Sequence, residues 1–334
     1  MKKSLKVGMI ICALVLLAAV LYAGREVFSG SFSYAHAEKY AAGGASIGEN
    51  VRNLDVHWVS GKVHIAYHEG TGIEISEWSA KPIPEDRQLR WWLDGETLRV
   101  QYEKPGVNWG LWNQSLEKEL TMNLPQGIEF ETVTISATSG DLDIPDLHTQ
   151  SLGLSVTSGR ISAAAKADAV TISATSGDIS LKLAETAQSL TVGTTSGSIG
   201  IDAQTVGRIS VSSTSGTIQA AAADAESFEA SSTSGTVSAD IIRVGTLKIS
   251  TTSGSITARV GSFGKMDAGS TSGTVTVFLP EQPGFTARVE TTSGGFEYDL
   301  PLSKQAGSYV CGDGSRDVHL HATSGDIRLK KNAE

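Results

Sequence analysis

Ten copies of the tripeptide Thr-Ser-Gly place a serine hydroxyl at regular intervals from residue 138 onward. A serine becomes a nucleophile when a neighbouring base accepts its proton. No histidine or lysine recurs at the same period, so the pattern favours a structural role in which small hydroxyls fit a tight corner. The glycines of the ten copies are Gly140, Gly159, Gly177, Gly197, Gly216, Gly235, Gly254, Gly273, Gly294 and Gly325.

Two histidines near the end of the chain, His319 and His321, have the spacing that places both on one face of a strand. Imidazole pairs bind transition metals when further ligands complete the set. No carboxylate partner is obvious in the sequence beyond Asp313 or Asp317. We therefore expect no metal site and no cofactor.

Other catalytic patterns are missing from the sequence. It contains no glycine-rich phosphate loop, no C-x-x-C and no H-E-x-x-H. A formal G-x-S-x-G match at 44–48 lies in a Ser/Ala/Gly-rich stretch rather than in the strand–turn–helix setting that this motif needs. A glycan-cleaving enzyme would require clustered acidic residues, whereas those of this sequence are scattered. We expect a protein that is not an enzyme.

All six tryptophans fall between residues 49 and 125. Tryptophan is enriched at recognition sites, where its flat apolar face stacks on a ligand. The candidate binding residues are Trp109 and Trp112, in a turn-like stretch, together with Trp91 and Trp92. The alternative is that these rings fill a cap that closes the end of a repeat domain.

The residue after each repeat glycine is charged in the first three copies: Asp141, Arg160 and Asp178. Opposite charges on neighbouring strands attract each other modestly. The pattern predicts a surface ladder, with contact to an ion or a saccharide as the alternative use.

Steady spacing defines the elements that must position these residues. Successive repeat glycines are mostly 19 residues apart, and apolar residues alternate with polar ones on both sides of each glycine. Valine, isoleucine, threonine and serine dominate, which argues against helices. Nineteen residues are too few for a propeller blade but sufficient for one coil of a β-solenoid. We predict an all-β fold, a β-solenoid (β-helix) of about ten 19-residue coils over 131–330.

The apolar alternation shifts by one residue at each repeat glycine. Leu190 and Val192 occupy even positions, whereas Ile199 and Ile201 occupy odd ones. In a straight strand this shift would turn the apolar side chains to the other face. A bend at the glycine keeps both faces inward, because glycine tolerates positive φ and bulge geometry.

An uncharged apolar run over 7–24 follows Lys2, Lys3 and Lys6. It is just long enough to span a membrane, and the preceding lysines predict a cytoplasmic N-terminus with the rest outside the cell. We expect a transmembrane signal anchor over 1–24 and a flexible linker over 25–48. Signal cleavage after Ala37, in an A-x-A sequence, is the alternative. A tryptophan-rich cap with irregular early coils is predicted over 49–130.

Composition excludes several classes. The formal charge of −9 argues against nucleic-acid binding, which needs a basic face. Two cysteines, Cys12 and Cys311, are too few for a disulfide scaffold. Because Cys12 lies in the apolar run, Cys311 is either buried and inert or available for pairing between chains.

The repeated T-S-G-[D/S/T]-[I/V] corners and the closing segments CGDG at 311–314 and HLHATSGDI at 319–327 resemble a bacterial family of unknown function described as candidate adhesins. LTMNLP at 120–125, leading into VTIS at 133–136, is similar to the family's entry into its repeats. The resemblance covers residues 49 to 330. With the anchor, it extends to the LiaG-like membrane proteins of Gram-positive envelope-stress operons. It implies a β-solenoid at the cell surface and carries no catalytic residues.

These observations predict a non-enzymatic, adhesin-like binding module on a membrane-anchored β-solenoid. A cell-wall polymer or an envelope protein is the expected partner. The first alternative is a structural or regulatory scaffold of the envelope-stress response without its own ligand. The second is a polysaccharide-active β-helix enzyme.

Overall fold

The computed structural model describes residues 34–106, 116–281 and 283–332, and within them the chain is all-β apart from the short 3-10 helices η1 (Ala37–Lys39) and η2 (Glu85–Arg87). The predicted anchor over 1–24 lies outside the described residues. No helix in the described part of the chain is long and apolar enough to cross a membrane. The described residues form two compact units: one comprises those up to 167 together with 172–177, and the other comprises 168–171 and those from 178 onward.

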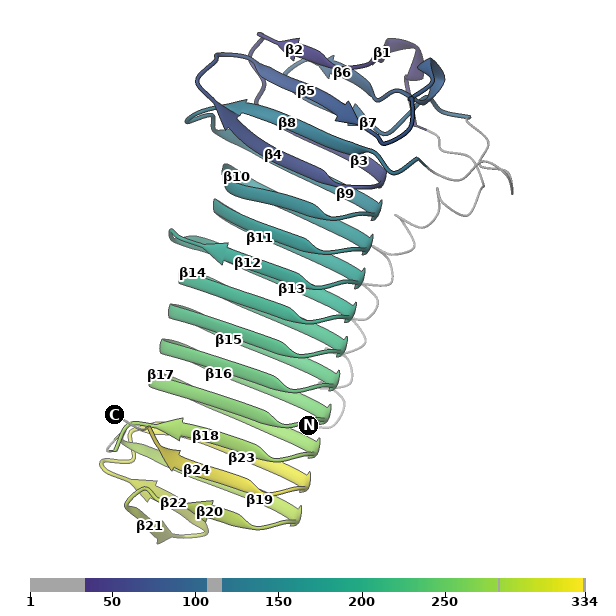
Figure 1. Ribbon diagram of the computed structural model, residues 1–334. Coiled ribbons are helices and arrows are strands. Elements are labelled where there is room, and N and C mark those ends of the chain that lie inside the picture. The colour runs from purple at the N-terminus through teal and green to yellow at the C-terminus, as the bar shows by residue number, and fades with distance from the viewer. Residues whose placement is uncertain (1–33, 107–115, 282, 333–334) are drawn as a thin grey trace. The chain divides into compact units, whose positions relative to one another are not determined.

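In the second unit, parallel coils repeat with the period that the sequence predicted. Residue i pairs with residue i+19 on the next coil, as in Ile199, Ile218, Val237 and Ile256. Figure 1 shows the longest of these coils stacked in chain order. The strands are β12 (Ile179–Leu183), β13 (Ala187–Ser196), β14 (Ile199–Ser215), β15 (Ile218–Ser234), β16 (Val237–Ser253), β17 (Ile256–Ser272) and β18 (Val275–Leu279).

Burial within one coil confirms the shift of alternation at the corner. In β14, Ile209 and Val211 are buried at odd positions, and after Gly216 the buried residues Ile218 and Ala220 are even. Two further shifts occur in mid-strand, one on each side of Val206, which is buried at an even position between odd-numbered buried residues at 199–203 and at 209–213. Each coil therefore has two longer runs, joined at the glycine corner and at a mid-strand bend around Val206, and both runs turn their apolar residues into one core.

The corner glycines are required chiefly by close stacking. A Cβ at Gly235 would lie 2.0 Å from the carbonyl oxygen of Gly216, and a Cβ at Gly254 would lie 2.0 Å from that of Gly235. Such contacts are far shorter than van der Waals separation, so no side chain fits. We expected glycine for its access to positive φ, but at these two corners the approach of the preceding coil's backbone decides the residue.

Hydroxyl columns run along the second unit. The serines of the repeat align as predicted, for example Ser215 with Ser234 and Ser253. A further hydroxyl column, three residues before each repeat glycine from Gly197 to Gly273, is buried, and there Ser270 donates to the carbonyl oxygen of Gly254 at 3.1 Å. The serines of the tripeptide themselves are exposed, and their structural use stays a prediction.

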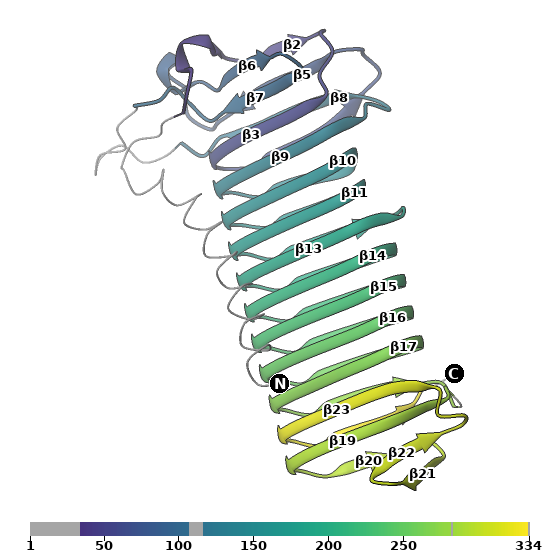
Figure 2. The ribbon, with the colours of Figure 1, turned by 180° about the vertical axis from the view of Figure 1, so that it is seen from behind.

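The last coils do not stack in chain order. The coil of β23 (Arg316–Ser324) and β24 (Ile327–Lys331) lies between that of β17 and β18 and that of β19 (Phe285–Ser293) and β20 (Phe296–Tyr298). Figure 2 shows β23 between β17 and β19. The intervening strands β21 (Leu302–Gln305) and β22 (Ser308–Cys311) form a hairpin whose strand β22 pairs with β19. This insertion explains the long interval between Gly294 and Gly325, and it corrects the expectation of purely sequential coils. Cys311 is fully buried with a free thiol, and burial raises its pKa.

The first unit contains coils of the same kind. Ser60-Gly61 forms a corner, since Gly61 donates its N–H to Ser139 O at 3.0 Å and Gly140 donates to Ser158 O at 2.9 Å. The parallel strands are β3 (Asn53–Ser60), β4 (Val63–His68), β7 (Thr97–Gln101), β8 (Glu119–Pro125), β9 (Phe130–Ser139) and β10 (Leu142–Ser158), while β11 (Ile161–Ser176) is shared between the units.

Antiparallel strands extend the outermost coil of the first unit. Strand β6 (Arg90–Asp94) pairs with β7, and β5 (Ile73–Trp78) pairs with β8. The short strands β1 (Ala41–Ala42) and β2 (Ala45–Ile47) then pair with β6 and β5. Short edge strands limit pairing with other chains. The linker expected over 25–48 is therefore too long: residues 41–42 and 45–47 belong to the sheet, and Ile47 is buried.

Candidate functional site

The four tryptophans chosen from the sequence do not form one described surface. Trp109 and Trp112 lie outside the described residues. Trp91 and Trp92 are consecutive on β6 and project from opposite faces of the strand, since Trp91 stands opposite Val100 and Trp92 opposite Arg99. They cannot offer a joint stacking platform.

Trp92 already packs against its own chain. Its ring centroid lies 5.6 Å from that of Tyr40 and 5.9 Å from that of His36, and Lys39 Nζ lies 4.6 Å from the centre of the ring. This arrangement supports the alternative use that we gave for the tryptophans, in which they close the cap.

Trp78 at the end of β5 is the most exposed large apolar side chain among the described residues, at 65%. Ile73 and Ile75 of the same strand are buried, whereas Glu74, Ser76 and Trp78 face solvent. The sequence contained the signal for this position, because extending the alternation of β5 places Trp78 on the outer face. The binding residues predicted from the sequence nevertheless did not include Trp78.

Polar residues lie beside this indole in register, on β5 itself and on the three strands that follow it in the sheet, β8, β4 and β10. We call the outward-facing set the Trp78 face: Glu74, Ser76, Trp78, Thr121, Asn123, Glu119, Lys62, His64 and Asp143. Trp78 stands opposite Glu119, and the next row runs from Ser76 through Thr121 and His64 to Asp143. Figure 1 shows β5 beside β8.

Fixed polar contacts order one side of the Trp78 face. Asp143 lies 2.9 Å from Lys62 Nζ and 3.1 Å from His64 Nδ1. The hydrogen bond from Lys62 and the nearby positive charges hold the pKa of Asp143 below its usual range. Asn123 donates to Glu74 at 3.4 Å. The face thus presents hydroxyl, amide and carboxylate groups on a sheet.

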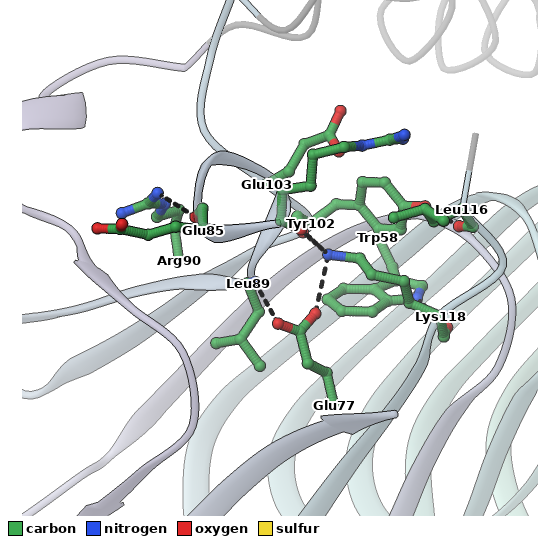
Figure 3. Close-up of polar contacts among 10 residues, drawn as sticks. Trp58, Glu77, Glu85, Leu89, Arg90, Tyr102, Glu103, Leu116 and Lys118 are labelled. Carbon is green, nitrogen blue, oxygen red and sulfur yellow. Dashed lines mark hydrogen bonds and ion pairs between the residues drawn. The ribbon is translucent and has the colours of Figure 1, made fainter. Parts of the chain in front are cut away.

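Glu77, next to Trp78, points to the opposite side of β5 and anchors it. Its carboxylate accepts the backbone N–H of Leu89 at 2.8 Å and lies 2.8 Å from Lys118 Nζ (Figure 3). Lys118 is completely buried and also donates to the carbonyl oxygens of Arg87, at 2.7 Å, and Tyr102. Burial lowers the pKa of Lys118 despite the opposing effect of Glu77.

Aromatic rings enclose this buried ion pair. The ammonium of Lys118 lies 4.1 Å from the ring centre of Tyr102 and 5.1 Å from that of Trp58, and Trp58 donates its indole N–H to Lys118 O at 3.0 Å. A charge paired, hydrogen-bonded and enclosed in this way has few alternative positions. The cluster therefore holds the end of β5 from its inner face. This also fixes the position of Trp78 on the outer face.

The predicted Asp141–Arg160–Asp178 ladder has a different basis from the one expected. Asp141 Oδ1 accepts the backbone N–H of Arg160 at 2.8 Å, and Asp178 Oδ1 accepts that of Ser198 at 2.9 Å. These carboxylates bind the backbone of the next coil, which is a structural use. Ion pairs between adjacent coils occur elsewhere, as between Asp224 and Arg243 at 2.8 Å.

A family model, Toastrack DUF4097, matches residues 51–266 and 243–330 of the chain. The search of curated proteins found no match to the chain.

Solved structures that the chain matches include a candidate adhesin from Parabacteroides merdae (12% identity, 88% of this chain and 97% of that chain, TM-score 0.44). A candidate adhesin from Bacteroides fragilis shares 13% identity over 88% of this chain and 98% of that chain, with a TM-score of 0.36. A candidate lipid-binding protein from Parabacteroides distasonis shares 14% identity over 88% and 97%, with a TM-score of 0.39.

Proposed function

Because the chain belongs to the Toastrack DUF4097 family, we propose that it is a non-enzymatic binding module of the cell envelope that holds a glycan polymer against the Trp78 face. The observation that carries this proposal is the exposed indole of Trp78 within ordered rows of polar side chains. A flat apolar ring stacks on the apolar face of a sugar, while neighbouring amides and carboxylates bind its hydroxyls.

A polar polymer suits this surface better than an apolar ligand. The face offers one large apolar group, and hydrogen-bonding groups of Thr121, Asn123 and Glu119 flank it. A polymer also allows several weak contacts to add along one chain. Acidic groups on the face, including Asp143 and Glu74, disfavour an anionic ligand unless a cation bridges the charges.

Display outside the membrane completes the proposal. The apolar run over 7–24 behind three lysines serves as the anchor, with the N-terminus in the cytoplasm and the β-domain in the cell wall. Protease digestion of intact and of lysed protoplasts locates the domain. Degradation in intact protoplasts is expected, whereas protection until lysis contradicts this topology.

Binding of the full chain, held in detergent micelles, to isolated cell wall tests the function. Saturable binding to wall from which proteins have been stripped is expected, and a calcium titration reveals any cation bridge. Wall fragments recovered afterwards should have unchanged length, since no turnover is proposed. Absence of binding with and without calcium, together with capture of a membrane protein by cross-linking, would favour the alternative of a scaffold without its own glycan.

A further inference from the structure

The outer face of β17, β23 and β19 carries a second cluster of functional groups, in the second unit. These strands are adjacent and parallel, so that Asp267, His319 and Arg288 form one row and Gly269, His321 and Glu290 the next. The two imidazoles stack, with ring centroids 5.0 Å apart and planes inclined by 24°. The out-of-order position of β23 is what brings Asp267 and Glu290 to either side of the histidines.

Three of these side chains offer ligand atoms to a common point. Asp267 Oδ1 lies 3.3 Å from His319 Nδ1 and 3.6 Å from His321 Nδ1, and one ligand atom from each residue lies within 4.8 Å of the others. Ligands around a tetrahedral zinc ion with bonds of about 2.0 Å are themselves about 3.3 Å apart. The spacing of the carboxylate oxygen from both nitrogens matches that edge.

The nitrogen of His321 that faces Asp267 has an unusual environment. Nδ1 of His321 is buried, yet it makes no hydrogen bond to the described residues, and 3.6 Å to Asp267 Oδ1 is too long for one. Buried polar atoms normally have a partner. A bound cation would give this nitrogen the partner that it lacks.

Glycine makes the space that this arrangement needs. A Cβ at Gly269 would lie 1.9 Å from His321 Nε2, so only glycine lets the imidazole lie over β17. On the other side, Glu290 Oε2 is 3.8 Å from His319 Nε2 and its second oxygen is 2.5 Å from Arg288. At 3.8 Å this contact is too long for a hydrogen bond, so Glu290 acts on His319 through its charge alone.

We propose that Asp267, His319 and His321 form a binding site for a divalent transition-metal ion of the zinc class, with solvent at the open position. Two imidazoles and one carboxylate suit zinc and its neighbours, whereas calcium and magnesium prefer oxygen ligands. The sequence offered only Asp313 and Asp317 as third ligands, which led us to expect no metal. The carboxylate comes instead from the neighbouring coil.

Titration of the full chain, without a polyhistidine tag, with Zn²⁺ and Co²⁺ tests the proposal. One equivalent of Zn²⁺ should bind, and bound Co²⁺ should give visible absorption typical of a low-coordinate site. His319→Gln, His321→Gln and Asp267→Asn should each weaken binding roughly tenfold or more. His64→Gln is the matched control, since His64 faces Asp143 at 3.1 Å without a second histidine.

Two outcomes would overturn the site. One is the absence of saturable Zn²⁺ binding to the wild-type chain. The other is binding that the His319, His321 and Asp267 variants leave unchanged. Circular dichroism of each variant separates loss of the site from loss of the fold, and Asp267→Asn keeps the shape of the side chain it replaces. A Ca²⁺ titration that gives the same response as Zn²⁺ also contradicts the proposed ligand chemistry.

Discussion

The imidazole of His321 on β23 lies directly over Gly269 of β17. A Cβ added at residue 269 would lie 1.9 Å from Nε2 of that ring. Gly269→Ala must therefore move the ring of His321, which is cheap for the fold because a side chain rather than backbone gives way. We expect Zn²⁺ affinity to fall roughly tenfold while the stability changes by less than about 1 kcal/mol. Isothermal titration and urea unfolding measure the two effects.

Gly200→Ala is the control for this change. Gly200 lies on a strand of the same unit, and the nearest atom that its Cβ would meet is Ile179 O at 3.8 Å, an ordinary contact. This variant should keep both stability and Zn²⁺ binding. Equal loss of metal binding in the two alanine variants would show that Zn²⁺ binding depends on strand glycines in general. It would contradict a specific requirement for the space above Gly269.

Gly235→Ala tests the close stacking of the corners. Its Cβ would lie 2.0 Å from the backbone oxygen of Gly216, and backbone of two coils must separate to admit it. We expect a loss of about 3 kcal/mol in the free energy of unfolding, as for other overpacked interiors. Urea unfolding against Gly200→Ala measures it, and equal midpoints for the two variants would contradict the stacking argument.

Lys118→Met tests the buried anchor beneath β5. It leaves the carboxylate of Glu77 buried without its ammonium partner, and breaking a buried pair in this way costs roughly 3–5 kcal/mol. Glu77→Gln in the same chain should recover much of that loss, because glutamine can still accept the Leu89 N–H. A double variant as unstable as the sum of the single variants would show that the two side chains act independently.

The lowered pKa of Asp55 predicts that the first unit loses stability in acid. Burial alone would raise the pKa of Asp55, but hydrogen bonds and charge from His57 and Arg99 lower it below its ordinary value of 3.8. A carboxyl group with a lowered folded pKa stabilises the protein above its unfolded pKa, and this stability is lost as the pH falls through the folded value. Asp55→Asn should therefore flatten the decline in melting temperature below about pH 4. Equal acid sensitivity of the wild-type chain and Asp55→Asn would contradict this role of Asp55.

The carboxylates after the repeat glycines should matter through the backbone. Asp178→Ala removes the acceptor of the Ser198 N–H and should cost about 1 kcal/mol. Arg160→Ala should stay within about 0.5 kcal/mol and should not affect wall binding. A large loss of wall binding in Arg160→Ala would instead support contact of this position with a saccharide.

The repeat could be predicted from sequence because each copy carries its own local signal. Three features predict the same coil: the period of the glycines, the apolar alternation around Leu190 and Ile199, and the preference for β-branched residues. The order of the last coils could not be predicted, since β23 matches the pairing pattern of β17 and of β19 equally well. The hairpin of β21 and β22 lies between β20 and β23 in the chain, and β22 pairs with β19.

The sites were less predictable than the coils. Trp91 and Trp92 attract notice as a pair, yet strand geometry sends them to opposite faces, while Trp78 is exposed by the alternation of β5. Asp267 is far from His319 in the sequence and becomes its neighbour only through the register of β17 with β23. Such pairings depend on tertiary stacking, which composition and spacing do not record.

The most direct test of the proposed function compares wall binding by the wild-type chain, Trp78→Ala and Tyr298→Ala. Tyr298 is the matched control, an exposed aromatic residue in the second unit, at 46%. The account predicts that Trp78→Ala weakens binding at least about tenfold, in line with the loss of a central aromatic contact, while Tyr298→Ala binds as wild type. Unchanged binding by a correctly folded Trp78→Ala variant would contradict the assignment of the Trp78 face.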